Sequence, residues 1–266
     1  MRTVGLFCII LLTGLAAGFE GNLTKEVRQV DGDAPVTMRQ AEMASNGVRQ
    51  VYPASLVGYY AWTWPYPPTP GLYSATMSVA FSGWTNARTA LDRSKKVYPT
   101  LKGDKYIAFG GGTEPGRFTR AGITSINAAI SGGLLSGYSG IVYDVEAGDS
   151  GLRGDFARSF ALAKSYGFSV VVTVSHSAPY GIGDAGTLMD SFLSSRNIDY
   201  ISPQLYTSGT EFSNDYSISS GYGWYKYQNS YPRVVVSIVH ARLYDDAFKY
   251  FRNIGIPLSG YIQWAQ

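Results

Sequence analysis

The sequence predicts an α/β fold in which eight parallel strands close into a (β/α)8 barrel of the TIM type. Three observations favour it. Eight short runs rich in Val, Ile and Tyr follow one another between residues 56 and 264. Several gaps between them have helical patterns, and alternating strands and helices imply parallel strands with right-handed crossovers. The 266 residues, 45% of them hydrophobic, suffice for one such domain.

Each element is predicted from its local pattern. The buried runs that we assign to strands are residues 56–62, 75–81, 105–109, 140–146, 168–175, 200–206, 233–239 and 260–264. The gaps that we assign to helices are residues 88–97, 123–134, 155–166, 185–195 and 244–254, the last four of them amphipathic. The predicted barrel domain therefore covers residues 53–266.

The first 18 residues have the pattern of a secretory signal peptide. Arg2 precedes an apolar run over residues 4–15, and small residues follow at positions 16–18. Cys8, the only cysteine, lies inside this leader, so the mature chain would have no disulfide and no thiol chemistry. We expect a secreted protein, with the lysosome or vacuole as alternative compartments.

Residues 19–52 form a separate polar segment with one predicted helix. Thr37 and Gln40 have capping-box spacing, and Asn46-Gly47 is a plausible end of that helix. The eighth strand ends at Trp264, so we expect the barrel to lack its eighth helix at the carboxyl end. The helix at 37–46 is expected to take that place outside the barrel. A disordered spacer or propeptide is the alternative.

Composition and isolated residues argue against several kinds of partner. A formal net charge of +3 gives no concentrated basic face, so nucleic acid is not expected. No stretch after the leader is apolar enough to span a membrane. His176 and His240 are too few ligands for a metal site. Residues 110–112 are a Gly triplet without the Lys-Ser/Thr of a phosphate loop. We expect a monomer without cofactor or metal.

The candidate acid residues end the strand at 140–146. Alternation sends Val142, Asp144 and Glu146 to one face, and the apolar Val142 indicates that this face points into the barrel. Two carboxylates at a barrel mouth are costly unless they are hydrogen-bonded or functional. Their repulsion raises one pKa, as a general acid requires. The alternative is a pair of rim carboxylates held in salt bridges.

Two other strands add polar and aromatic side chains to the same mouth. Ser202, Gln204 and Tyr206 share one face of the sixth strand, and Ile262 and Trp264 share one face of the eighth. An acid, an amide, a phenol and an indole suit a sugar ring, because the indole stacks on its apolar face while the others bind hydroxyls or an amide. A carbohydrate is therefore the expected partner.

Residues 140–146, GIVYDVE, resemble the fourth-strand signature of glycoside hydrolase family 18, the chitinase family, usually DGxDxDxE. Other segments resemble that family in the expected order. They are residues 59–62 in its first strand, 108–111 for the SxGG of its third, 204–206 for the Q-x-Y of its sixth, and the Trp264 strand for its eighth. The resemblance covers nearly all of residues 53–266.

The resemblance implies a role for each matching residue. Glu146 would protonate the glycosidic oxygen, and Asp144 would orient the N-acetyl group and stabilise an oxazolinium-like intermediate. Tyr206 would hydrogen-bond the same acetamide, and Trp264 would form the floor under the cleaved sugar. The remaining implied substrate contacts are Gln204 and Tyr60. This is substrate-assisted retention, in which the acetamide supplies the nucleophile and no enzyme nucleophile is needed.

Four positions depart from the family pattern. Ser139 and Val142 replace the first two Asp of the signature, Ala108 replaces the third-strand Ser, and Thr207 stands where Asn or Asp is common. Val142 removes a carboxylate that would share a proton with Asp144, so the rate and the pH optimum are expected to differ from the family's.

The leading hypothesis is a secreted chitinase-like hydrolase of β-1,4-linked N-acetylglucosamine polymers. One alternative is a lectin-like or inhibitory relative without turnover, and another is an endo-β-N-acetylglucosaminidase acting on glycoprotein glycans. The sequence leaves chitin and glycan substrates unseparated, because both present the same reacting sugar.

Overall fold

A computed structural model describes residues 54–64 and 74–265. The expected signal peptide at 1–18, the polar segment at 19–52 and its helix at 37–46 lie outside the described residues.

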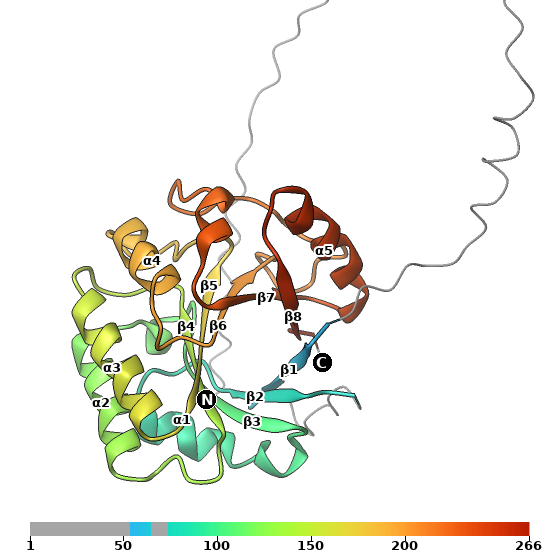
Figure 1. Ribbon diagram of the computed structural model, residues 1–266. Coiled ribbons are helices and arrows are strands. Elements are labelled where there is room, and N and C mark those ends of the chain that lie inside the picture. The colour runs from blue at the N-terminus through green and yellow to red at the C-terminus, as the bar shows by residue number, and fades with distance from the viewer. Residues whose placement is uncertain (1–53, 65–73, 266) are drawn as a thin grey trace, which may run out of the picture. The chain divides into compact units, whose positions relative to one another are not determined.

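Eight parallel strands form a closed barrel in sequence order, which confirms the predicted fold class (Figure 1). The strands are β1 Leu56–Trp62, β2 Met77–Phe81, β3 Asp104–Gly110, β4 Gly140–Val145, β5 Ser169–Ser175, β6 Tyr200–Gln204, β7 Arg233–Ile238 and β8 Leu258–Gln263. Each strand pairs with the next, and β8 pairs with β1 through the register Leu56 to Gly260. The carboxyl ends of all strands therefore meet at one mouth.

The predicted helices lie on the outside of the barrel (Figure 1). They are α1 Ala87–Ser94, α2 Arg120–Ser131, α3 Arg153–Ser165, α4 Ala185–Leu193 and α5 Tyr244–Asn253. The predicted start of the second helix at residue 123 is wrong. The helix begins at Arg120 because the Thr119 hydroxyl accepts a hydrogen bond from the Gly122 N–H at 3.0 Å. Between β6 and β7 stands a 3-10 helix, η3 Trp224–Asn229.

Side-chain alternation along the strands separates the core inside the barrel from the cores outside it. Val142 belongs to the cluster inside the barrel, whereas Tyr143 belongs to the cluster between the strands and the helices. The Tyr143 hydroxyl lies 2.8 Å from Ser159 of α3, which fixes that outward face. The expected inward face of β4, with Val142 and Asp144, is confirmed.

The outer face of β1 is covered by the connection between α1 and β3. Tyr59 and Ala61 are buried with Val97 and Leu101 of that connection. The backbone N–H of Lys102 donates to the Tyr59 hydroxyl at 3.1 Å. The outer face of β1 thus obtains apolar cover from a segment within the barrel domain.

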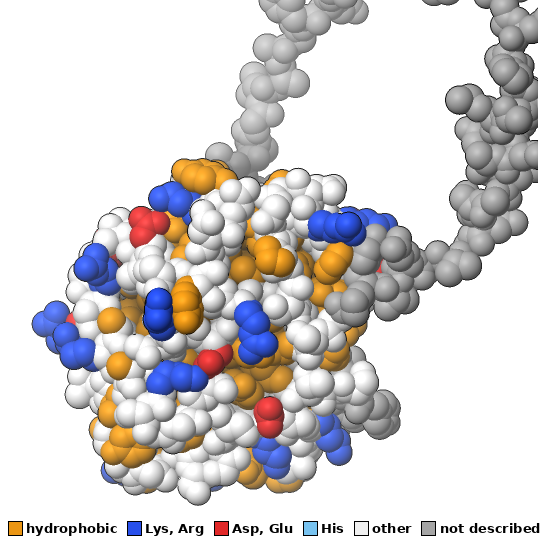
Figure 2. Space-filling view, viewed as in Figure 1, with side chains coloured by type: hydrophobic (Ala, Val, Ile, Leu, Met, Phe, Trp, Pro, Cys, Tyr) orange, Lys and Arg blue, Asp and Glu red, His pale blue; other side chains and the backbone are white. Residues whose placement is uncertain are grey.

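Charged side chains are dispersed over the face of the molecule that Figure 2 shows. On the face shown in Figure 2, Lys and Arg side chains are spread over several elements and do not form one patch. None of the described helices has the length and apolar composition that crossing a membrane requires.

Candidate active site

A pair of carboxyl groups, one buried and one half-buried, lies at the barrel mouth. Asp144, the inward residue near the end of β4, is 2% exposed, and Glu146 directly follows the strand. The Gln204 side-chain amide donates to Asp144 Oδ1 at 3.0 Å and to Glu146 Oε1 at 3.3 Å. Ser175 at the end of β5 donates its hydroxyl to Glu146 Oε2 at 3.4 Å. One amide on β6 therefore holds both carboxyls.

Burial sets the protonation of this pair. It raises the pKa of Asp144 well above its ordinary value, and the charge of Glu146 adds to the rise. Burial also raises the pKa of Glu146, against the opposing effect of hydrogen bonds from Gln204 and Asp144. Since two adjacent buried carboxyls cannot both ionise cheaply, the pair retains one proton to higher pH than a separate Asp and Glu would.

That shared proton is what a general acid needs. The interaction with Glu146 raises the pKa of Asp144, whereas the interaction with Asp144 lowers the pKa of Glu146, so the pair favours a proton on Asp144. A proton held between two carboxyls can move to Glu146 when a ligand makes ionised Asp144 the better acceptor. The pair can therefore provide both a proton donor and a neighbouring carboxylate from one shared proton.

Tyr206 has a buried hydroxyl without a hydrogen-bond partner in the described chain. Its side chain is 7% exposed, and its hydroxyl has no hydrogen-bond partner within the part of the chain that the structure describes. A buried phenol without a partner costs free energy, roughly 1–3 kcal/mol. A ligand acceptor placed in the mouth would satisfy it.

Trp264, directly after β8, is the centre of an aromatic group that we call the indole platform. Its ring centroid lies 5.8 Å from that of Tyr206, with an interplanar angle of 28°. Trp62 at the end of β1 lies 4.9 Å away, and Phe81 at the end of β2 lies 5.2 Å away. Trp64 is 53% exposed and stacks on Trp62 at 5.4 Å. This surface presents aromatic faces beside the carboxyl pair, as sugar recognition requires.

Tyr60 lies deeper than the other predicted contacts. It is 1% exposed, and its hydroxyl is 3.1 Å from Ser237, which in turn lies 2.9 Å from Ser202. Its ring contacts Trp264 at 5.4 Å. The structure places Tyr60 as a support of the indole platform, and direct contact with a substrate stays a prediction.

The Gly triplet at 110–112 provides room for the pair. Gly110 and Gly111 have backbone φ angles of 109° and 137°, which residues other than glycine rarely adopt. A Cβ at Gly110 would lie 2.2 Å from the Asp144 carbonyl oxygen, and one at Gly112 would lie 2.8 Å from Glu146 Oε2. The interpretation of the triplet as backbone room beside the site is confirmed.

His176 follows β5 and belongs to a polar contact at the rim. Its backbone has a φ of 48°, and its Nε2 lies 3.1 Å from the Asp215 carboxylate. Burial would raise the pKa of Asp215, but hydrogen bonds from Ser217 and His176 outweigh it and lower that pKa. Over residues 54–64 and 74–265, no group of three or more His, Cys, Asp or Glu side chains is arranged to hold a metal ion.

Two neighbours of Glu146 were missed from sequence. Ser175 lies on the inward face of β5, two positions after Thr173, so alternation could have found it. Tyr180 lies in the loop between β5 and α4 and donates its hydroxyl to the Gly112 carbonyl at 3.1 Å. No periodic signal marks a loop residue of this kind.

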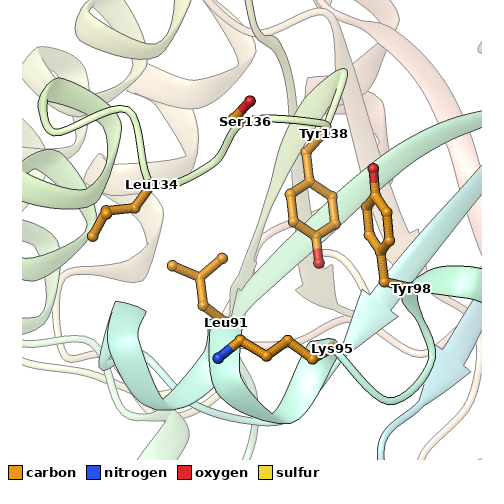
Figure 3. Close-up of a pocket in the computed structure, with 6 residues that line it drawn as sticks. All are labelled: Leu91, Lys95, Tyr98, Leu134, Ser136 and Tyr138. Atoms are coloured by element: carbon orange, nitrogen blue, oxygen red, sulfur yellow. The ribbon is translucent and has the colours of Figure 1, made fainter.

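A separate cavity lies outside the barrel, away from the carboxyl pair. It has a volume of about 250 Å³ and is bordered by α1 and the loop after α2 (Figure 3). Its lining residues are Leu91, Lys95, Tyr98, Leu134, Ser136 and Tyr138. Lys95 is paired with Asp92 at 3.0 Å, so the lining adds no unpaired charge. This hollow lacks the acid groups that distinguish the barrel mouth.

Comparison with known proteins does not assign a function to the chain. No protein-family profile matches the chain, and no curated protein matches it. Among solved structures, the chain is similar to the spore cortex-lytic enzyme SleL of Bacillus megaterium QM B1551. The TM-score is 0.46 and the identity 8%, over 79% of this chain and 70% of that one. The argument for function therefore depends on the site itself.

Proposed function

We propose that this protein is a retaining glycoside hydrolase that cleaves β-1,4-linked N-acetylglucosamine polymers with the help of the substrate's own acetamide. The observation that carries the proposal is the carboxyl pair Asp144 and Glu146, joined by Gln204 and placed beside the indole platform. The resemblance of residues 140–146 to the family 18 signature supports the same chemistry.

The first step breaks the glycosidic bond. The sugar to be cleaved stacks on Trp264, and its acetamide carbonyl hydrogen-bonds the Tyr206 hydroxyl, which has no other partner in the described chain. The acetamide N–H hydrogen-bonds Asp144, which favours the ionised form of that carboxyl and moves the shared proton to Glu146. Glu146 then protonates the glycosidic oxygen while the acetamide carbonyl oxygen attacks C1, so that the C1–O bond breaks, the leaving sugar departs as an alcohol and an oxazolinium ion forms.

In the second step, water hydrolyses the oxazolinium ion and the carboxyl pair regains its proton. The Asp144 carboxylate stabilises the positive charge of the oxazolinium ion until water attacks it. Glu146, now a carboxylate, accepts a proton from water as that water attacks C1 and reopens the ring. Two displacements at C1 retain the β configuration, and the proton returns to the pair.

The departure at position 142 fits this arrangement. Val142 is fully buried and offers Asp144 no partner deeper in the barrel, so Asp144 is held by Gln204 and Glu146. We propose that the carboxyl pair cycles its proton without a third carboxylate. The predicted leader suits an enzyme that meets its polymer outside the cytoplasm.

Product analysis tests the proposal. Purified protein is incubated with chitotetraose and, separately, with a high-mannose glycopeptide, with Glu146→Gln as control. The products are identified by mass spectrometry, and the anomeric configuration of their new reducing ends is followed by ¹H NMR. Shortened oligomers that retain the β-anomer, and that the variant does not form, are the expected result. Cleavage of the glycopeptide alone would favour the endo-β-N-acetylglucosaminidase. Binding of chitotetraose without any product would overturn the hydrolase and favour a lectin-like protein.

A further inference from the structure

Tyr180 extends over the end of β4 from one neighbouring strand to the other. It lies in the loop after β5, and its hydroxyl donates to the carbonyl of Gly112, in the loop after β3. Because β4 lies between β3 and β5 in the barrel, this hydrogen bond spans the position where Glu146 leaves the strand.

The Tyr180 hydroxyl lies close to the candidate acid. The position that a Cβ on Gly112 would take is 2.8 Å from Glu146 Oε2 and 2.9 Å from the Tyr180 hydroxyl oxygen. The backbone adds a second link, since the Gly181 N–H donates to the Glu146 carbonyl at 2.9 Å. Tyr180 is nevertheless 56% exposed, so much of its ring faces solvent.

The ring stands opposite the indole platform. Trp264 follows β8, which lies across the closed barrel from β4, and Tyr180 follows β5, which lies across from β1. A sugar stacked on Trp264 places its glycosidic oxygen toward Glu146. The next sugar along the polymer then lies on the Glu146 side of that bond, where Tyr180 is the exposed aromatic ring.

We propose that Tyr180 forms the leaving-group wall of the site: its ring receives the departing N-acetylglucosamine unit, and its bond to Gly112 holds the ring beside Glu146. This inference rests on the proposed function. An aromatic face contacts the apolar face of a pyranose, and a sugar lying there excludes water from the acid during the first step. Stacking of this kind increases kcat/KM only for substrates whose leaving group is a sugar.

Two substrates separate this role from a general loss of activity. Chitotetraose has a sugar as leaving group, whereas chitobiosyl β-fluoride has a single atom. Tyr180→Ala should lower kcat/KM on chitotetraose by roughly three- to tenfold more than on the fluoride. Tyr180→Phe keeps the ring but frees it from Gly112, so its loss on chitotetraose should be smaller. The matched control is Tyr166→Ala, which removes a tyrosine that is 52% exposed at the far end of α3.

The outcomes distinguish a failure of the proposed leaving-group wall from a failure of the proposed function on which it rests. An active wild-type protein whose Tyr180→Ala variant loses both substrates equally, or neither, would overturn the wall alone. Equal losses in Tyr180→Phe and Tyr180→Ala would also overturn it, because the hydroxyl and not the ring would then carry the effect. A wild-type protein that cleaves neither substrate overturns the proposed function and the wall together. Melting temperatures of all variants show whether a loss comes from unfolding.

Discussion

Glu146→Gln is the substitution that most directly tests the candidate acid, because the site can accept an amide. The new amide oxygen can keep the place of Oε1, which accepts from Gln204 at 3.3 Å. The amide nitrogen then takes the place of Oε2, 3.4 Å from the Ser175 hydroxyl, which can rotate to accept. We therefore expect the free energy of unfolding to change by less than about 1 kcal/mol on this account.

The expected catalytic loss is large. General acid catalysis contributes roughly 10²- to 10⁴-fold to a rate, which equals about 2.7–5.4 kcal/mol of activation free energy. The variant also removes the charge that is the second cause of the raised pKa of Asp144. The pKa of Asp144 should therefore fall in the variant, while burial keeps it above its ordinary value.

The assay has three measurements. kcat/KM on chitotetraose should fall by at least about 100-fold, calorimetric binding should stay within about threefold, and carboxyl ¹³C titration should show the lower pKa of Asp144. A folded variant that cleaves chitotetraose at the wild-type rate would refute Glu146 as the acid. A variant that binds much more weakly would show that the carboxyl holds the substrate and does not only protonate it.

Three further substitutions test the surroundings of the pair. Folding raises the pKa of Asp144, so the native state binds a proton that the unfolded chain releases, and stability falls as pH rises from about 3.9 to the native pKa. Asp144→Asn should therefore raise the melting temperature at pH 7 but not at pH 3, by roughly 2–4 °C for each kcal/mol recovered; equal effects at both pH values would contradict this. Gly112→Ala places a Cβ 2.8 Å from Glu146 Oε2 and should lower kcat roughly 100-fold through displacement of the acid, with an unchanged kcat as the contrary result. Val142→Asp buries a carboxyl at a fully buried position, so it should lower the melting temperature and move the pH–rate profile through coupling to Asp144; a folded variant with the wild-type profile would show that position 142 does not affect the pair.

Sequence patterns predicted the barrel because each strand carries its own signal. Val142 and Tyr143 show this, since one lies inside the barrel and the next packs against α3. Boundaries were predicted less well. The strand predicted to run to residue 206 ends at Gln204, because pairing with β7 reaches only Ser237 in its register. A strand end depends on hydrogen bonds to a neighbour far along the chain, which one run of residues does not contain.

The candidate site likewise has contacts that the sequence predicted and contacts that it did not. Alternation along β4 and β6 was enough to bring Asp144 and Gln204 to one face, and the structure joins them at 3.0 Å. The contact between Tyr180 and Gly112 joins residues 68 apart in sequence, from two loops without periodicity. Such a contact depends on the path of the backbone between the strands, so the sequence offered no signal for it.

The cover over β1 has a consequence for the order in which the chain can assemble during synthesis. Tyr59 meets its partners 41 and 43 residues later, at Thr100 and Lys102, soon after they leave the ribosome. The edge of β1 that pairs with β8 stays unpaired far longer. The hydrogen bond at the start of this pairing joins Ser55 to Ser259, 204 residues apart. Translation at about 5–20 residues per second keeps that edge open for roughly ten seconds or more. For that interval the nascent chain carries a strand with one protected face and one unpaired edge, which is the state most exposed to strand exchange with other chains.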